Sequence, residues 1–390
     1  MNSEILMQAA SRYETPAYLF DLDAFSGRIR RIKELLGEGI KLCYAMKANP
    51  FLVSAASLDI DRFEVCSPGE YAICERAGVT GKRIVLSGVN KEKADLRHVM
   101  ESRGAGTFTV ESVRQLELLE ACAAEQSTTV RVILRVTSQN QFGMEEDQIR
   151  DIVRGRNGYP HLSIQGLQMY TGTQKKKYSK MEKEVTGLVR FLQELRDQYG
   201  FEGKELEYGP GFYVPYFEGE EETDWEETVR TFAGLLRGLP FSGTWILEMG
   251  RFLAAPCGYY LTRIVDQKKN GGQNYAIVDG GIHHLNYYGQ TMAMKIPHHR
   301  FFPKHDGEEK RWTICGSLCT AGDVLVKNLP LCGADIGDLL VFERVGAYSV
   351  TEGIYLFLSR KLPLVLVYSE REGLRVVRGA WRTDELVGGT

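Results

Sequence analysis

Short apolar stretches alternate with amphipathic stretches over most of the first two thirds of the chain. The segment VESVRQLELLEACAAE (110–125) places its apolar residues near helical spacing, whereas the apolar stretches around it are brief. This alternation predicts strands that are followed by helices. Eight strands are expected, at residues 40–45, 62–65, 83–86, 106–110, 129–136, 161–170, 205–208 and 244–248.

Eight strand–helix repeats within this part of the chain have the size and pattern of a (β/α)8 TIM barrel. We therefore predict an α/β fold with the barrel over residues 24–255. An open, doubly wound sheet remains the alternative, because the order of the strands in space cannot be read from a sequence. In a barrel of this kind, the active site forms at the carboxyl ends of the strands.

The pattern changes after residue 256, where strand-like stretches follow one another with little helical spacing between them. The stretch TPAYLFDL (15–22) has the same character and precedes the barrel. We therefore predict a second domain from residues 1–23 and 256–390, folded as a β-barrel or sandwich. Its strand-like stretches are GYYLTRIVDQ, NYAIVDGG, RWTICGSL, DLLVFERVGAYS, PLVLVY and LRVVRGAW.

The composition is that of an ordinary globular protein, with 43% hydrophobic residues, 25% charged residues and a formal net charge of −3. This charge gives no sign of a nucleic-acid or membrane partner. No run approaches the roughly 18 apolar residues of a membrane helix, and the N-terminus lacks a leader pattern. The eight cysteines are scattered without metal-ligand spacing. We therefore expect a cytoplasmic protein with reduced thiols and no metal site.

Charged residues and glycines gather at the predicted strand ends. Lys47 follows the first strand in KLCYAMKANP, and Glu248 and Arg251 follow the last in EMGR. Two other strands end in glycine-containing turns, whose backbone N–H groups can approach an anion. The residues at these ends are Lys47, Glu64, Glu70, Arg135, Tyr170, Gly172, Thr173, Gly209, Gly211, Glu248 and Arg251.

A lysine, an anion-binding turn and a carboxylate on one rim together suit pyridoxal phosphate. The lysine can form a Schiff base with the aldehyde, the turns and Arg251 can bind the phosphate, and an acid can keep the ring nitrogen protonated. Each feature alone has a simpler explanation. Lys47 would be a surface lysine, each turn a tight turn, and Glu248 with Arg251 a structural ion pair.

Eight motifs occur in the order YAMKANP, EVCSPGE, MYTGTQ, YGPGFYVPYF, EMGRFLA, VDGGIHH, GSLCTAGDVL and GDLLVFERVGAY. In their order and spacing, from about Thr15 to Val367, the chain resembles the fold-type III pyridoxal-phosphate decarboxylases, which include the diaminopimelate and ornithine decarboxylases. YTGTQ, VPYF and GSLCT are most similar to the branch that acts in butirosin biosynthesis on L-glutamate tethered to an acyl carrier protein. The resemblance implies an alanine-racemase-like barrel, a β domain and a homodimer with shared active sites.

The resemblance also implies a role for each matching residue. Lys47 would carry the cofactor as a Schiff base, and Glu248 would keep the pyridine nitrogen protonated. Cys319 would reach the site from the other subunit and protonate the carbanion after carbon dioxide has left. Tyr170 would stack on the ring in place of a histidine. The other cofactor residues would be Glu64, Glu70 and Arg135 around Lys47, and Thr173, Gly209, Gly211, Arg251 and Tyr348 around the phosphate.

The chain also departs from the family pattern. Its phosphate turn contains Pro210 between two glycines, and proline has no N–H to donate. Thr320 stands where diaminopimelate decarboxylases carry a glutamate for the distal amine, and their substrate arginine is absent from HHLNYYG (283–289). Because an unpaired buried charge costs about 3–5 kcal/mol, we expect a substrate with a neutral distal end. Substrate contacts are expected from His283, Tyr287, Thr320 and Asp323.

The sequence thus predicts a pyridoxal-phosphate-dependent decarboxylase of an amino acid or of a carrier-bound aminoacyl group, in secondary metabolism. The alternatives are a diaminopimelate decarboxylase of lysine biosynthesis, an amino-acid racemase and an inactive cofactor-binding homologue. Glu248 argues against a racemase, because family racemases usually pair the pyridine nitrogen with arginine. The lysine run at 175–183 is either a contact for an acidic carrier or a solvated helix face.

Overall fold

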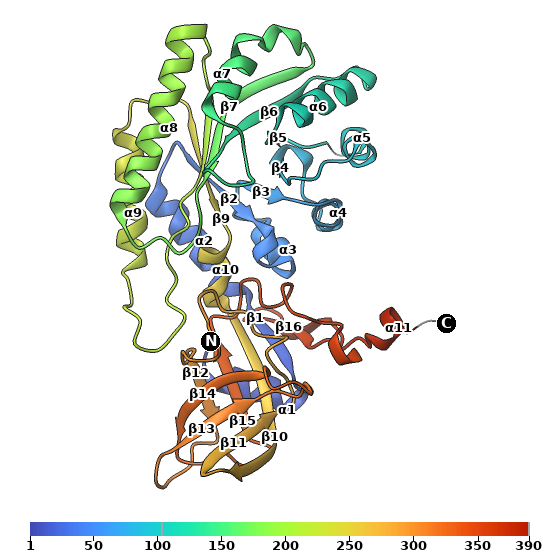
Figure 1. Ribbon diagram of the computed structural model, residues 1–390, viewed down its shortest axis with the longest axis vertical. Helices are drawn as coiled ribbons and strands as arrows, with labels where there is room; N and C mark the ends of the chain where they lie inside the picture. The colour runs from blue at the N-terminus through green and yellow to red at the C-terminus, as the bar shows by residue number, and fades with distance from the viewer. Residues whose placement is uncertain (103, 389–390) are drawn as a thin grey trace. The chain divides into compact units, whose positions relative to one another are not determined.

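The computed structural model describes residues 1–102 and 104–388, which form two compact units. One unit contains most of the chain between Arg28 and Phe252 and is a barrel (Figure 1). The other unit combines residues 1–27 with the residues that follow Phe252, and it is built on a β-sheet. The segment Val214–Glu222 belongs to this second unit, whereas the predicted boundaries place it in the barrel.

Eight parallel strands close into a barrel in their order along the chain (Figure 1). The last strand pairs with the first, so that Ile40 lies beside Trp245 and Tyr44 beside Met249. Closure satisfies the backbone groups that an edge strand would expose. The strands are β2 Ile40–Ala45, β3 Arg62–Val65, β4 Ile84–Leu86, β5 Thr107–Val110, β6 Val130–Val136, β7 Leu162–Tyr170, β8 Glu205–Gly209 and β9 Thr244–Met249.

These strands agree with the eight predicted ones to within one residue at each end, and the predicted TIM-barrel fold is confirmed. The agreement has a physical cause. Strands of a parallel barrel are covered on both faces, so they appear in the sequence as continuous apolar runs. Accordingly, every residue of β5 and β8 is buried, and so are five of the six residues of β2.

Helices follow the strands, and several begin at residues whose side chains cap them. The hydroxyls of Ser67 and Ser112 accept the N–H groups of Glu70 and Gln115, each at 3.2 Å. No described helix combines the length and the apolar character that a membrane span requires. The helices are α2 Leu22–Leu36, α3 Val53–Ala56, α4 Pro68–Arg76, α5 Lys93–Glu101, α6 Val113–Glu125, α7 Glu146–Arg154, α8 Tyr178–Tyr199, α9 Trp225–Gly238 and α10 Arg251–Ala254.

An ion-paired cluster fills the amino end of the barrel. Arg62 donates two hydrogen bonds to Glu205, at 2.9 and 2.7 Å, and Arg131 donates a third at 2.6 Å. Burial alone would raise the pKa of Glu205, but the hydrogen bond and charge of Arg62 lower it below its ordinary value. Farther along the strands, an apolar cluster of Cys43, Val85 and Ile246 packs inside the barrel.

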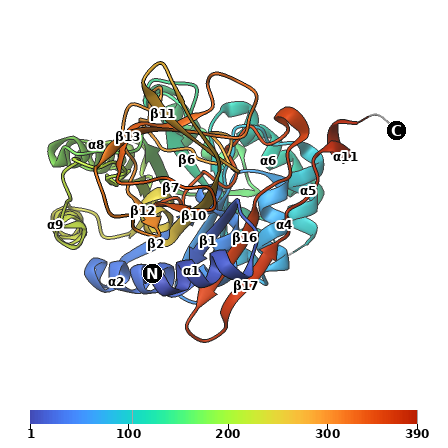
Figure 2. The same cartoon turned by 90° about the horizontal axis from the view of Figure 1, so that it is seen from below.

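The second unit is a mixed sheet of nine strands. The first half of its long strand β10 pairs with β1 and β15, and the second half pairs with β11. The N-terminal strand β1 lies between β10 and β16 and is therefore internal to the sheet (Figure 2). The strands are β1 Ala17–Asp21, β10 Gly258–Asn270, β11 Gln273–Val278, β12 His299–Phe302, β13 Lys310–Cys315, β14 Val324–Leu331, β15 Leu339–Glu343, β16 Leu364–Ser369 and β17 Gly373–Arg378.

Helix α1 Ser3–Arg12 covers part of this sheet, although the sequence analysis predicts no helix there. The helix begins after Asn2, whose side chain accepts the N–H of Ile5 at 3.0 Å. Strands β12 and β14 are also absent from the predicted elements, as is the short helix α11 Asp384–Val387. One apolar cluster joins α1 to β1, β10, β15 and β16, and it consists of Leu6, Ala9, Ala10, Ala17, Leu19, Tyr259, Leu261, Leu339, Val341, Leu364 and Leu366.

Replacing Arg62 with leucine leaves Glu205 with a single, half-exposed arginine partner. We expect the thermal midpoint of the protein to fall by about 8 °C, which corresponds to about 3 kcal/mol. The matched variant Arg131→Leu removes the more exposed partner and should lower the midpoint by only about 2 °C. Circular dichroism measures both values. Equal losses in the two variants would contradict this account of the cluster.

Candidate active site

Lys47 lies on a turn directly after β2 and not on the strand itself. A short 3-10 helix, η1 Met46–Ala48, carries it. Asn49 is extended, with φ of −165°, as expected for a residue before Pro50. The side chain of Asn49 accepts the N–H of Phe51 at 3.1 Å. This sharp turn places Lys47 at the carboxyl end of the barrel.

The Lys47 side chain lies between two carboxylates. Its Nζ is 2.8 Å from Oε2 of Glu64 on β3 and 3.7 Å from Oε1 of Glu248 on β9. The thiol of Cys66 lies 3.9 Å from Nζ and donates to the other oxygen of Glu64 at 3.2 Å. About 40% of the Lys47 side chain is exposed, so the core does not seal off its amino group.

The two carboxylates differ in their tendency to hold a proton. Burial alone would raise the pKa of Glu64, but the charge and hydrogen bond of Lys47 hold it below its ordinary value. Burial raises the pKa of Glu248 from 4.5 to about 7, and the negative charge of Glu64 adds to this shift. Glu64 is therefore ionised near neutral pH. Glu248 gives up its proton less readily, and a cation beside it would stabilise its carboxylate form.

Glu70 and Arg135 stabilise neighbouring strand ends. Oε2 of Glu70 accepts the backbone N–H of Cys66 at 2.6 Å, and burial raises the pKa of this carboxyl. Arg135 donates to Oε1 of Glu111 at 3.0 Å, and its guanidinium lies 4.8 Å from the centre of the Phe142 ring. Because Glu70 binds the backbone two residues after Glu64, this contact supports Lys47 only indirectly.

Two glycine turns at the ends of β7 and β8 pack against each other. Gly211 has a left-handed backbone, with φ of +59°, and a Cβ there would lie 2.1 Å from the carbonyl oxygen of Gly172. The N–H of Lys175 donates to the Gly211 carbonyl at 2.8 Å. Nε of Arg251 donates to the Thr173 hydroxyl at 3.3 Å. These turns, together with a hydroxyl and a guanidinium, form a cradle that fits a phosphate group.

The ring of Tyr170 lies close to the second turn. A Cβ on Gly209 would be 2.5 Å from Cδ2 of Tyr170, so glycine is required at this position. Burial raises the pKa of the Tyr170 hydroxyl, which is therefore neutral. Pro210 lies between the two glycines and has no N–H, so the middle residue of the turn offers no donor to an anion.

A buried ion pair supports the cradle from behind. Nζ of Lys175 lies 2.7 Å from Oε2 of Glu184 on α8, and the Tyr208 hydroxyl donates to the same oxygen at 2.5 Å. The Thr171 hydroxyl donates to the other oxygen at 2.7 Å. Only 4% of the Lys175 side chain is exposed. Neither of the two expectations for the run at 175–183, a carrier contact or a solvated face, holds for Lys175, because its charge is paired within the fold.

Cys319 and Thr320 are exposed on the loop between β13 and β14 of the β unit, and Cys319 is a free thiol. Both oxygens of Asp323 accept backbone N–H groups, from Ile282 and from Leu318, each at 2.7 Å. Asp323 therefore shapes this loop. The predicted site residues on the β unit are His283, Tyr287, Cys319, Thr320, Asp323 and Tyr348.

Tyr287 and His283 are buried within the β unit. The Tyr287 hydroxyl donates to the carbonyl of Glu343 at 2.6 Å, and its ring packs against Tyr216 and Phe217. Burial lowers the pKa of His283 to about 4, and neither of its ring nitrogens has a hydrogen-bond partner among the described residues. A contact of either side chain with substrate stays a prediction.

Several residues at the barrel mouth are missing from the sequence analysis. Lys91 is partly buried and donates to the Gly88 carbonyl at 2.6 Å, and desolvation lowers its pKa to about 8. Glu111 directly follows β5 and pairs with Arg135, so the rule applied to the other strand ends could have found it. Gln168 and Glu207 lie within strands, where a polar residue inside a buried run is the only signal.

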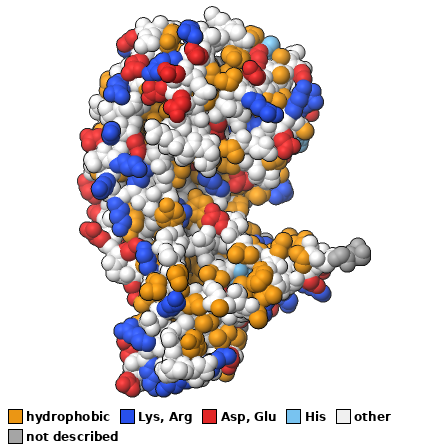
Figure 3. Space-filling view, in the orientation of Figure 1, with side chains coloured by type: hydrophobic (Ala, Val, Ile, Leu, Met, Phe, Trp, Pro, Cys, Tyr) orange, Lys and Arg blue, Asp and Glu red, His pale blue; other side chains and the backbone are white. Residues whose placement is uncertain are grey.

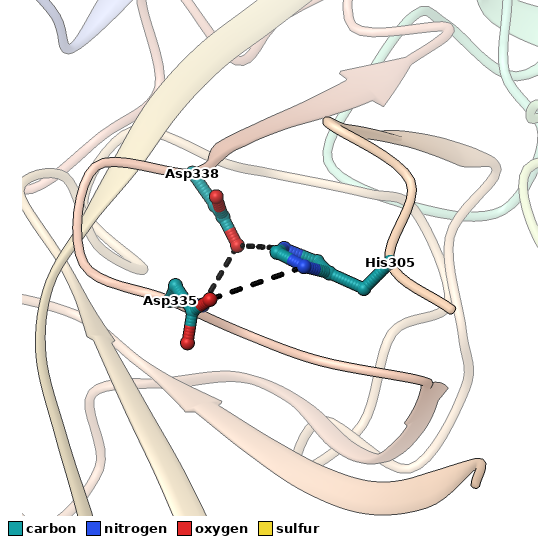
Figure 4. A group of neighbouring side chains, drawn as sticks. All are labelled: His305, Asp335 and Asp338. Carbon is teal, nitrogen blue, oxygen red and sulfur yellow. Dashed lines mark hydrogen bonds and ion pairs between the residues drawn. The ribbon is translucent and has the colours of Figure 1, made fainter. Parts of the chain in front are cut away.

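One group of His and Asp side chains within the described ranges has ligand atoms close enough to share a metal ion. It lies on the β unit and consists of His305, Asp335 and Asp338 (Figure 4). Nε2 of His305 is 2.6 Å from Oδ2 of Asp338. This is the length of a hydrogen bond, whereas two ligands of a tetrahedral zinc ion lie about 3.3 Å apart. The same oxygen accepts the N–H of Asp335 at 2.7 Å, so the group closes a turn.

Known proteins have related sequences over most of this chain. Residues 22–255 match the family described as "Pyridoxal-dependent decarboxylase, pyridoxal binding domain". The chain is 28% identical to the L-glutamyl-[BtrI acyl-carrier protein] decarboxylase of Niallia circulans, over 96% of this chain and 94% of that protein. It is 26% identical to the 2-[(L-alanin-3-ylcarbamoyl)methyl]-2-hydroxybutanedioate decarboxylase of Staphylococcus aureus, over 89% of this chain and 92% of that protein.

The fold is also that of a solved diaminopimelate decarboxylase. The crystal structure of the M. jannaschii enzyme in complex with L-lysine covers 98% of this chain and 93% of its own, with a TM-score of 0.87 and 22% sequence identity. The barrel residues fit pyridoxal phosphate, the cofactor of the matched family. They offer an amino group at Lys47, a carboxylate at Glu248 that favours a cationic partner, and the anion cradle around Gly211 and Arg251.

In the protein without cofactor, the contribution of Glu248 to stability should be lost as the pH rises from about 5 to about 8. Folding raises the pKa of Glu248 from 4.5 to about 7, so this carboxyl takes up a proton on folding in that range. Glu248→Gln has no such proton to lose. Relative to the unsubstituted protein, it should gain about 3 kcal/mol of stability between pH 5 and pH 8. Urea unfolding at both pH values measures the difference.

Glu202→Gln, at an exposed position, is the matched control and should leave the pH dependence unchanged. If Glu248→Gln and the unsubstituted protein show parallel pH profiles, Glu248 does not titrate as its burial implies.

Proposed function

The chain belongs to the pyridoxal-dependent decarboxylases, and from that premise we propose that it removes the α-carboxylate of an aminoacyl group whose distal end is joined to an acyl carrier protein. The reaction would belong to secondary metabolism. The observation that carries the decarboxylase chemistry is the position of Lys47, whose Nζ lies 2.8 Å from Glu64 and 3.7 Å from Glu248. The relative that acts on an L-glutamyl carrier protein supports the class of substrate.

Each barrel residue has a defined task in this reaction. Bound pyridoxal phosphate supplies a conjugated ring that accepts the electron pair of the breaking C–C bond. Lys47 would hold the cofactor covalently through Nζ and would release it to the amine of the substrate. Glu64 binds the released amino group of Lys47 and keeps it charged. Glu248, as a carboxylate, would bind the ring nitrogen of the cofactor and keep a proton on it.

The α-carbon needs a proton once carbon dioxide has left, and Cys319 is the proposed donor. Its thiol is free and exposed on the β unit. The C–C bond to the carboxylate breaks, carbon dioxide departs, and a C–H bond forms with the thiol proton. Water then returns a proton to the thiolate. In this proposal the thiol comes from a second copy of the chain, so each active site is shared.

The surface of the β unit favours such a homodimer. Figure 3 shows hydrophobic side chains gathered on one face of this unit. Among the large apolar side chains, Ile282, Met292 and Ile354 are exposed and line one groove of about 500 Å³. Leu356 and Phe357 are exposed as well. Apolar groups that gather on a surface in this way are typical of protein–protein interfaces.

A neutral distal end of the substrate is consistent with the residues at the expected positions. Thr320 carries no charge, and the Tyr287 hydroxyl already donates to the Glu343 carbonyl. Neither residue can neutralise the distal amine or carboxylate of diaminopimelate. Leaving such charges unpaired would cost about 3–5 kcal/mol if the site is closed to water. A thioester or an amide at the distal end avoids this cost.

The purified protein with pyridoxal phosphate should release carbon dioxide from a glutamyl-loaded carrier protein and leave free diaminopimelate unchanged. Mass spectrometry of the carrier follows the loss of carbon dioxide. Lys47→Ala is the inactive control and should also lose the yellow colour of the bound cofactor.

Turnover of diaminopimelate alone would refute the proposed substrate and would support the lysine-biosynthesis alternative. Interconversion of enantiomers without loss of carbon dioxide would indicate a racemase instead.

Exposed lysines just before α8 and on its second turn are the proposed contact for the acidic carrier. Lys176, Lys177 and Lys183 are exposed, and α8 begins shortly after the cradle residue Thr173. Replacing all three with glutamate should raise KM for the carrier substrate about tenfold with little change in kcat, because opposite charges steer association. The KM should also rise steeply with salt.

Lys82→Glu is the matched control, because Lys82 is exposed at the amino end of the barrel, just before β4. An unchanged KM in the triple variant would refute the contact and leave the lysine run as a solvated helix face.

A further inference from the structure

Glu207 is a buried carboxyl group that the reaction proposed above does not use. It lies on β8, two residues before Gly209, and its exposed fraction is 0%. Neither of its carboxyl oxygens has a hydrogen-bond partner in the part of the chain that the structure describes. A buried carboxylate that accepts no hydrogen bond destabilises the fold, whereas a neutral carboxylic acid at this position costs much less free energy.

The charges that surround Glu207 favour the neutral form. Burial raises its pKa well above the ordinary value, and the carboxylates of Glu248, Glu64 and Glu205 act in the same direction. Arg62 acts in the opposite direction, but it already donates two hydrogen bonds to Glu205. Its burial and the lack of a donor to either oxygen thus favour the protonated form, which has one O–H to donate.

Gln168 offers the acceptor that this O–H lacks. It lies directly opposite Glu207 in the pairing of β7 with β8, and it is 2% exposed. Its Nε2 donates to Oε2 of Glu248 at 3.3 Å. Its Oε1 is buried and has no hydrogen-bond partner among the described residues. An unpartnered amide oxygen and an unpartnered acid on adjacent strands are complementary.

We propose that Glu207 is a neutral carboxylic acid that donates its O–H to Oε1 of Gln168, and that this bond makes Gln168 a fixed donor to Glu248. Glu207 and Gln168 are then positioning residues that act through Glu248. The inference rests on the proposed function only in that Glu248 binds the pyridine nitrogen of the cofactor.

The bond matters because an amide side chain can bind in two orientations. With an O–H donor on one side, only one orientation satisfies Gln168, and its NH2 group then always faces Glu248. A donor at this position stabilises the carboxylate form of Glu248, whereas burial and Glu64 favour its protonated form. Glu207 thus helps to maintain the negative charge that the pyridine nitrogen requires.

The first test is spectroscopic and needs neither cofactor nor turnover. The infrared difference spectrum between the cofactor-free protein and its Glu207→Gln variant, at neutral pH, should show the C=O band of a protonated carboxylic acid. A pair of carboxylate bands in its place would overturn the proposal. Because this measurement is independent of the reaction, it holds whether or not the proposed function is correct.

The second test separates positioning from packing. Glu207→Gln keeps an N–H that can donate to Gln168 and should retain at least half of kcat. Glu207→Leu fills the same space without a donor and should lower kcat about tenfold, with KM changed less than twofold. The pH dependence of the absorbance of the bound cofactor should differ between Glu207→Leu and Glu207→Gln.

Gln168→Leu removes the amide that links Glu207 to Glu248, and it should lower kcat as much as Glu207→Leu does. The double variant should be no worse than either single one, because both remove the same donor to Glu248. If the two losses in kcat multiply in the double variant, the proposal is wrong. It is also wrong if Glu207→Gln lowers kcat as much as Glu207→Leu does. Thermal midpoints of the cofactor-free variants show whether each folds, and if Glu207→Leu does not, the comparison of Glu207→Gln with Gln168→Leu still decides.

Discussion

The balance of charge around Lys47 is the constraint on which the rest of the barrel depends. A closed barrel has no room for solvent at its centre, yet this one places Glu64, Glu248 and Glu207 inside it. One lysine can neutralise only one of them. Lys47 stabilises the ionised form of Glu64, and the negative charge of Glu64 then disfavours ionisation of Glu248 and Glu207. The order in which these carboxyls hold protons is therefore a property of the whole interior and not of any single residue.

The two ends of the barrel treat buried charge differently. At the amino end, Glu205 has two arginine partners and is fully compensated. At the carboxyl end, compensation is left incomplete, and the missing positive charge is the one that a cofactor would bring. The supporting contacts follow the same logic. Glu184 and Lys175 satisfy each other behind the phosphate cradle, so the turns in front of them are held in place before any anion arrives.

The sequence was most informative where a single physical rule governed many residues. Burial on both faces made the barrel strands visible as apolar runs, and the rule that sites form at strand ends selected Lys47 and its neighbours. Helix α1 and strand β14 are absent from the predicted elements, and each buries only part of its residues. The burial of Lys175 could not be foreseen, because its partner Glu184 lies on another element. Likewise, Gln168 and Glu207 became meaningful only when the pairing of β7 with β8 brought them together.

The internal position of β1 has a consequence for the synthesis of the chain. Tyr18 pairs with Tyr260 on one side and with Val365 on the other. The residues from Arg28 to Tyr213, and then to Phe252, leave the ribosome long before Val365 does, and they contain the complete barrel. Until β10 is made, β1 has no strand to pair with. One edge of β1 then stays unpaired until β16 follows, although all five of its residues are buried in the finished sheet. Residues that are made early thus complete their pairing late, and a nascent chain that stalls before β16 would expose one edge of β1 to its surroundings.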